Sequence, residues 1–186
     1  MLSVYATLDA DRFPTGWQAS LSTGDNEPIT QELEVGSQFS YVKILGAADP
    51  DLDGTDEAFI RTKTHLYHSG ATHEVGIFGF DDGKIFQVTV EDAPLNFQVG
   101  AISYFSQGAE CRDVDFDGKP EFVTLAIDGV INDVQKWTEK IYTWGKRALI
   151  LSDRNEGKLA KTSYTDPLLR RFYGLRCFEF DPPAPY

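Results

Sequence analysis

Two short acidic segments hold the residues whose types and spacing could do chemistry. Residues 49–57 read D-P-D-L-D-G-T-D-E and residues 113–121 read D-V-D-F-D-G-K-P-E, so both follow D-x-D-x-D-G-x-x-E, with an offset in residue number of 113 − 49 = 64. Three carboxylates at alternate positions of one turn repel each other unless a cation lies between them. Calcium takes about 6–8 oxygen ligands from such loops, with glycine at the sixth position for the sharp turn. The two segments therefore predict two calcium sites.

Each predicted site uses carboxylates and one backbone carbonyl, which comes from the seventh position. The predicted ligands are Asp49, Asp51, Asp53, Thr55 and Glu57 at the first site, and Asp113, Asp115, Asp117, Lys119 and Glu121 at the second. An EF-hand would need glutamate at the twelfth position, where this chain has Ile60 and Thr124. Strand-forming residues follow each loop, so the loops are predicted to join strands and not helices.

The acidic segments belong to a longer internal repeat. At the same offset, positions 33–88 match the following part of the chain without a gap, so that Phe59 aligns with Val123 and Ile77 with Ile141. A second acidic loop in register with the same apolar pattern is not expected by chance, and an internal repeat of this kind dictates the fold. The chain is therefore predicted to contain two equivalent β units.

Two such loops, each between the apolar strands of a repeating unit, resemble FG-GAP (VCBS-type) repeats over roughly residues 33–155. Those repeats form the calcium-bearing blades of integrin α-chain propellers and occur in many secreted bacterial proteins. The resemblance implies an all-β fold of two tandem antiparallel blades, propeller-like but incomplete, each with one structural calcium. It also implies adhesion, recognition or appendage to an enzyme as the role, because the family is known for these. The repeats carry no catalytic chemistry of their own.

The chain is expected to form a single β domain over residues 1–186. The predicted parts are repeat units at 33–96 and 97–160, with the N-terminal strands of 1–32 and the C-terminal segment 161–186 covering sheet edges. A short helix is predicted after Asp166, which would cap it, with Pro167 at its first position and Gly174 beyond its end. Whether the units pack as a closed propeller, a sandwich or otherwise stays open, as does the oligomeric state.

Composition excludes several classes of partner. The formal net charge of −12 argues against nucleic acid and anionic membrane surfaces, because both attract basic patches. No run of about 20 apolar residues is present, so no membrane span is expected. The two cysteines, Cys111 and Cys177, predict one disulfide in an oxidising compartment, and two buried free thiols in a cytosolic protein are the alternative.

These features favour a calcium-stabilised protein, secreted or on the cell surface, that recognises a protein or glycan. No signal peptide is recognised at the N-terminus, and a cytoplasmic location stays open. One alternative is a carbohydrate-active enzyme or accessory domain with structural calcium. Another is an acidic intracellular interaction or inhibitor protein. Catalysis is not the leading expectation, because no nucleophile elbow, phosphate-binding loop or Cys–His pair is found.

Overall fold

All regular elements in the described part of the chain are strands. The computed structural model describes residues 2–8, 14–22, 27–33, 42–67, 70–102, 105–131, 134–160 and 174–177. The strands are β1 (Leu2–Leu8), β2 (Pro14–Leu21), β3 (Ile29–Leu33), β4 (Lys43–Ala48), β5 (Glu57–Tyr67), β6 (Gly70–Asp81), β7 (Lys84–Gln87), β8 (Thr89–Val90), β9 (Ala93–Pro94), β10 (Asn96–Ile102), β11 (Phe105–Arg112), β12 (Glu121–Ile131), β13 (Val134–Trp144), β14 (Leu149–Ala160) and β15 (Gly174–Arg176). The all-β prediction is confirmed, and the helix predicted after Asp166 lies outside the described residues.

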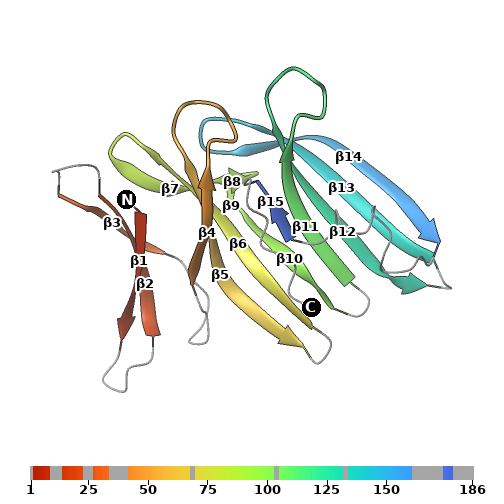
Figure 1. The fold of residues 1–186 in the computed structure, drawn as a ribbon, viewed down its shortest axis with the longest axis horizontal. Coiled ribbons are helices and arrows are strands. Elements are labelled where there is room, and N and C mark those ends of the chain that lie inside the picture. The colour runs from red at the N-terminus through yellow and green to blue at the C-terminus, as the bar shows by residue number, and fades with distance from the viewer. Residues whose placement is uncertain are drawn as a thin grey trace.

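Ten strands form one sheet in the order β14-β13-β12-β11-β10-β6-β5-β4, with β15 paired parallel to β11 and β7 paired antiparallel to β6 (Figure 1). A separate sheet holds β1, β2 and β3, a further pair holds β8 and β9, and none of these described sheets closes into a barrel. The prediction of two separate blades is therefore not supported. Strand β10 pairs with both β6 and β11, because an edge left open on either unit would expose unpaired backbone groups.

The offset of 64 in residue number is visible in the strands themselves. Strand β12 matches β5 at both ends, since 121 − 57 = 64 and 131 − 67 = 64. The ladder pair Ala58 with Phe78 in the first repeat (β4–β7) corresponds to Phe122 with Tyr142 in the second repeat (β11–β14). Residues 98–112 read as one continuous strand in the sequence, but the structure has two strands there, β10 and β11. This break was not predictable, because Ile-Ser-Tyr-Phe at that point contains neither glycine nor proline.

The two repeats pack through opposite faces. The largest apolar cluster joins Phe59 and Ile77 of the first repeat to Phe122 and Tyr142 of the second, with Phe97 of β10 between them. The position equivalent to Phe59, which is Val123, belongs instead to a cluster on the far face of the second repeat. Face-to-back packing buries both faces of the middle strands, which explains why they read as continuous apolar runs and not as alternating ones.

The three-stranded N-terminal sheet continues this arrangement on the other side of the first repeat. Ala19 of β2 lies in one buried cluster with Ala58, Ile60 and Phe78. Figure 1 shows β1–β3 as a separate layer beside β4 and β5. These N-terminal strands pack on a face of the large sheet, and no described strand of theirs is hydrogen-bonded into it.

One further contact joins the two repeats, and a disulfide joins the C-terminal strand β15 to the second repeat. The β6–β7 turn of the first repeat meets the β13–β14 turn of the second, where Arg147 Nη2 lies 2.8 Å from Asp81 Oδ2 and the Arg147 guanidinium lies over the Phe86 ring. Cys111 and Cys177 form a disulfide, with their Cα atoms 4.7 Å apart. The disulfide confirms the predicted pairing and holds β15 beside β11, close to the second acidic loop.

Candidate metal centres

The two acidic loops join equivalent strands and fold alike. One loop runs from β4 to β5 and the other from β11 to β12, and both project from the same edge of the molecule (Figure 1). Leu52 and Phe116, at the fourth position, have φ of 59° and 64°. The sixth-position glycines, Gly54 and Gly118, both have φ of 90°, in a region that glycine adopts readily. Two loops with one backbone conformation and one ligand pattern indicate one shared role.

Local hydrogen bonds from the backbone shape each loop around its aspartates. In the first loop the amide of Gly54 donates to Asp49 Oδ2 at 2.9 Å, and the amide of Thr55 donates to Asp53 Oδ1 at 2.8 Å. The second loop repeats both bonds. Gly118 donates to Asp113 Oδ2 at 3.0 Å, and Lys119 donates to Asp117 Oδ1 at 2.8 Å. These bonds turn the carboxylates inward, so each loop gathers negative charge at one point.

Each loop brings three carboxylates close enough to share one metal ion. Ligand oxygens lie within 4.8 Å of one another in the group Asp49, Asp51 and Asp53, and likewise in the group Asp113, Asp115 and Glu121. Among the predicted ligands, Glu57 stands outside the first group and Asp117 outside the second. The chemistry of both groups, carboxylate oxygen only, suits a hard cation.

Glu57 is the clearest sign that the first loop is built for a cation. Its side chain is buried although it begins β5, and its Oε2 has no hydrogen-bond partner among the described residues. Burial, and then the charges of Asp51, Asp53 and Asp49, raise the pKa of Glu57 to about 8. A buried carboxylate beside three others is costly unless a cation offsets it.

The second loop satisfies its glutamate differently. Glu121 is also buried, and its Oε2 accepts a hydrogen bond from the backbone amide of Val114 at 2.8 Å. Asp113 Oδ1 is buried and has no hydrogen-bond partner within the part of the chain that the structure describes. Each loop thus has one buried carboxylate oxygen without a hydrogen-bond partner among the described residues, Glu57 Oε2 in one and Asp113 Oδ1 in the other.

Sequence reasoning missed the fourth position of the loops. Leu52 is 57% exposed and Phe116 is 90% exposed, and both have the left-handed backbone that large side chains rarely adopt. The available signal was a large apolar residue between two aspartates in both loops, where a solvated turn would carry a polar residue or glycine. These residues contribute exposed apolar tips beside each cluster of carboxylates.

Within the described residues, no helix is long and apolar enough to cross a membrane. Comparison of the chain with models of known protein families, with curated proteins and with solved structures gave no significant match.

Proposed function

We propose that this chain is a secreted or cell-surface β-repeat protein, stabilised by two calcium ions, that recognises a protein or glycan. The observation that carries the proposal is the pair of equivalent acidic loops, each with a buried carboxylate oxygen that lacks a hydrogen-bond partner among the described residues. The loops resemble those of FG-GAP repeats. That resemblance links the calcium sites to recognition and not to catalysis.

Calcium fits these loops better than the other common divalent ions. Their ligands are carboxylate and backbone oxygens on a flexible loop, which calcium accepts in irregular geometry, whereas magnesium needs a near-octahedral shell and retains water. Zinc would favour nitrogen or sulfur ligands, and the two clusters contain neither. With two ions bound, the formal net charge would change from −12 to −12 + 4 = −8.

The disulfide supports an extracellular location. Cys111 and Cys177 are paired, and such bonds persist in oxidising compartments but not in a reducing cytosol. This observation favours a secreted protein over the alternative of an intracellular interaction or inhibitor protein.

The test is unfolding of the purified chain in EDTA, in about 1 mM magnesium and in about 1 mM calcium, together with calorimetric calcium titration. Ions that bind the folded state alone raise its stability by RT ln(1 + [L]/Kd), about 2.7 kcal/mol per site at one hundred times Kd. We expect two sites and a rise in stability that magnesium does not reproduce. Equal unfolding in all three solutions would overturn the calcium proposal.

A further inference from the structure

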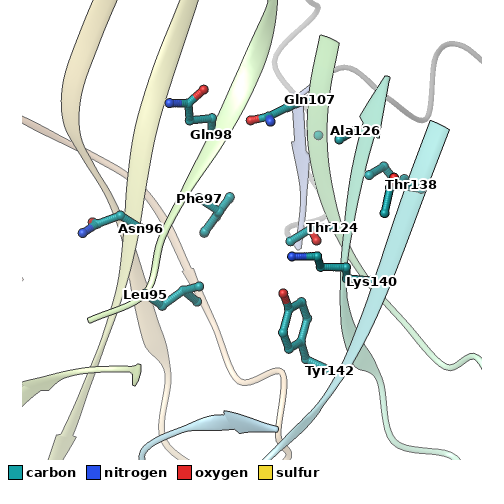
Figure 2. A pocket seen from close by; sticks show the side chains of 12 residues that line it. Leu95, Asn96, Phe97, Gln98, Gln107, Thr124, Ala126, Thr138, Lys140 and Tyr142 are labelled. Carbon is teal, nitrogen blue, oxygen red and sulfur yellow. The ribbon is translucent and has the colours of Figure 1, made fainter. Parts of the chain in front are cut away.

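A pocket lies where β10 and β11 separate inside the large sheet. The two strands pair at only three positions, Gly100 to Ile102 with Phe105 to Gln107, and then diverge. The cavity between β10 on one side and β11, β12 and β13 on the other has a volume of about 430 Å³ (Figure 2). That volume falls within the usual range for small-molecule sites, about 300–1,000 Å³.

The pocket has one apolar wall and one polar wall. Strand β10 and the residue before it contribute the side chains of Phe97 and Leu95, which face the polar groups of β11–β13 in Figure 2. The polar wall carries the Gln107 amide, the Tyr142 hydroxyl and the Lys140 ammonium. Among the described residues, neither an aspartate nor a glutamate lines this pocket, although the chain is strongly acidic. The walls suit a ligand with one apolar face and several hydroxyls.

Lys140 is the charged group in this wall. It comes from the middle of β13, its ammonium group points into the pocket in Figure 2, and it forms no ion pair with a described residue. A partly buried lysine without an ion-pair partner among the described residues favours a ligand that brings a negative charge.

Comparison of the two repeats shows that packing alone does not require these polar groups. The ladder pair Thr124 with Lys140 corresponds to Ile60 with Gly76, since 124 − 60 = 64 and 140 − 76 = 64. Ile60 is fully buried against the N-terminal sheet. The second repeat therefore places a hydroxyl where the first packs an aliphatic side chain, and an ammonium where the first has glycine.

The polar wall is held in position before any ligand arrives. A hydrogen bond joins the Thr124 side chain to the Tyr142 hydroxyl, while burial raises the pKa of Tyr142, so this hydroxyl stays protonated. Nearby, the Phe97 and Phe122 rings pack edge to face with centroids 5.0 Å apart. Groups fixed in this way lose little freedom on binding.

We propose that this pocket binds a sugar unit that carries a carboxylate, with the ring against Phe97 and the carboxylate at Lys140. The proposal rests on the proposed function, because it names a site and a ligand class for glycan recognition. The net charge of −12 disfavours long polyanions, so the fit is to a short or terminal acidic sugar. A free hydroxy acid offers the same polar groups without the ring.

The test is an NMR titration of isotope-labelled protein in calcium with three probes, glucuronate, glucose and gluconate. Glucose lacks the carboxylate, and gluconate lacks the ring. We expect glucuronate to shift the amide signals of Gln107, Thr124 and Lys140, and to bind about tenfold more tightly than glucose, as a charge-assisted hydrogen bond predicts. Gluconate binding as tightly as glucuronate would show that the ligand is a small hydroxy acid and would overturn the glycan assignment.

Two variants test the lysine. Lys140→Met keeps the aliphatic stem and should lower glucuronate affinity about tenfold, to that of glucose. Lys136→Met is the matched control, because Lys136 is exposed on the same strand and does not line the pocket. A third variant, Thr124→Ile, restores the residue of the first repeat and should abolish binding without lowering the melting temperature. Equal affinities of the two lysine variants, or shifts confined to other residues, would contradict the proposal.

Failure of the pocket and failure of the proposed function give different results. The calcium-dependent rise in melting temperature is measured on the same samples. A calcium effect without saturable glucuronate binding overturns the pocket assignment alone. Loss of the calcium effect overturns the calcium-stabilised function whether or not glucuronate binds.

Discussion

At the scale of single residues, the carboxylates of each acidic loop repel one another, and a bound cation would offset that repulsion. Asp51 shows both effects. It belongs to the first cluster of carboxylates, and its charge helps to raise the pKa of Glu57. Without a cation, Asp51 destabilises the loop, and with one it becomes a ligand.

Asp51→Ala should therefore have opposite effects in calcium and in EDTA. In calcium at one hundred times Kd, the variant should lose about 2–3 kcal/mol of unfolding free energy with the loss of one ion. In EDTA it should be as stable as the wild type or more stable, because one repelling charge is gone. Urea unfolding measures both values.

Asp56→Ala is the control for that substitution. Asp56 lies in the same loop, is exposed, and is absent from the carboxylate cluster, so calcium should stabilise this variant as it does the wild type. A calcium response of Asp51→Ala as large as that of Asp56→Ala would remove Asp51 from the ligand set.

His73 should make the folded state less stable as the pH falls. Burial, followed by the charge of Arg61, lowers the pKa of His73 below its ordinary value of 6.5, and Thr64 Oγ1 lies 3.0 Å from His73 Nδ1. The unfolded chain therefore binds a proton before the folded one does. Stability from the neutral ring is complete above the unfolded pKa and is lost as the pH falls below it, towards the lowered folded pKa.

His73→Gln should flatten this part of the stability profile. Between about pH 7.5 and pH 5.5, the wild type should lose more unfolding free energy than the variant, because glutamine does not titrate. Chemical unfolding at a series of pH values tests this. Parallel profiles for the two proteins would show that His73 titrates alike in the folded and unfolded states.

At the scale of elements, the disulfide matters because β15 is short. Strand β15 pairs with β11 at three positions, Gly108 to Glu110 with Gly174 to Arg176, and such a short pairing contributes little by itself. Cys177 follows directly and is covalently joined to Cys111 across a sequence separation of 66 residues. In the chain-entropy account, the disulfide stabilises the folded state, including the pairing of β15, mainly because it restricts the conformations of the unfolded chain.

Replacing both cysteines with alanine should lower the unfolding free energy by about 4 kcal/mol in the chain-entropy account. Denaturant unfolding of the variant and of the oxidised wild type measures the difference. Reduced wild type should behave like the variant. If reduction leaves the wild-type midpoint unchanged, β15 is held by its other contacts.

At the scale of the whole molecule, the two repeats share one sheet and one apolar cluster. Phe97 is the central link, since it belongs to the strand that joins the repeats and its ring packs against Phe122. Neither repeat can open without exposing the cluster, so the described strands should unfold as one cooperative unit.

Phe97→Ala should cost about 3–5 kcal/mol, the usual range for removing a buried phenylalanine. Tryptophan fluorescence reports on separate parts of the chain, because Trp17 lies in the N-terminal sheet and Trp144 in the second repeat. Circular dichroism and fluorescence should still give the same unfolding midpoint, because the strands unfold as one unit. Separate midpoints for the two probes would show that the repeats unfold independently.

The amino-acid sequence by itself determined the local features of this protein. Strand character follows from apolar and aromatic runs, the loops from alternating aspartates before a glycine, and the repeat from a constant offset of 64 in residue number. The two cysteines also predicted the disulfide, with two free thiols as the alternative. These features depend on neighbouring residues or on counts, so they can be read without coordinates.

Only the tertiary structure decided what each strand lies against. It showed that β10 joins the repeats into one sheet, that they pack through opposite faces, and that Lys140 lines a pocket. Phe59 of the first repeat and Phe122 of the second lie in one cluster, although they are not equivalent positions, because the two repeats pack through opposite faces. Strand pairing and face choice depend on contacts between residues far apart in the chain, and a local pattern that alternates between two faces does not say which partner covers each.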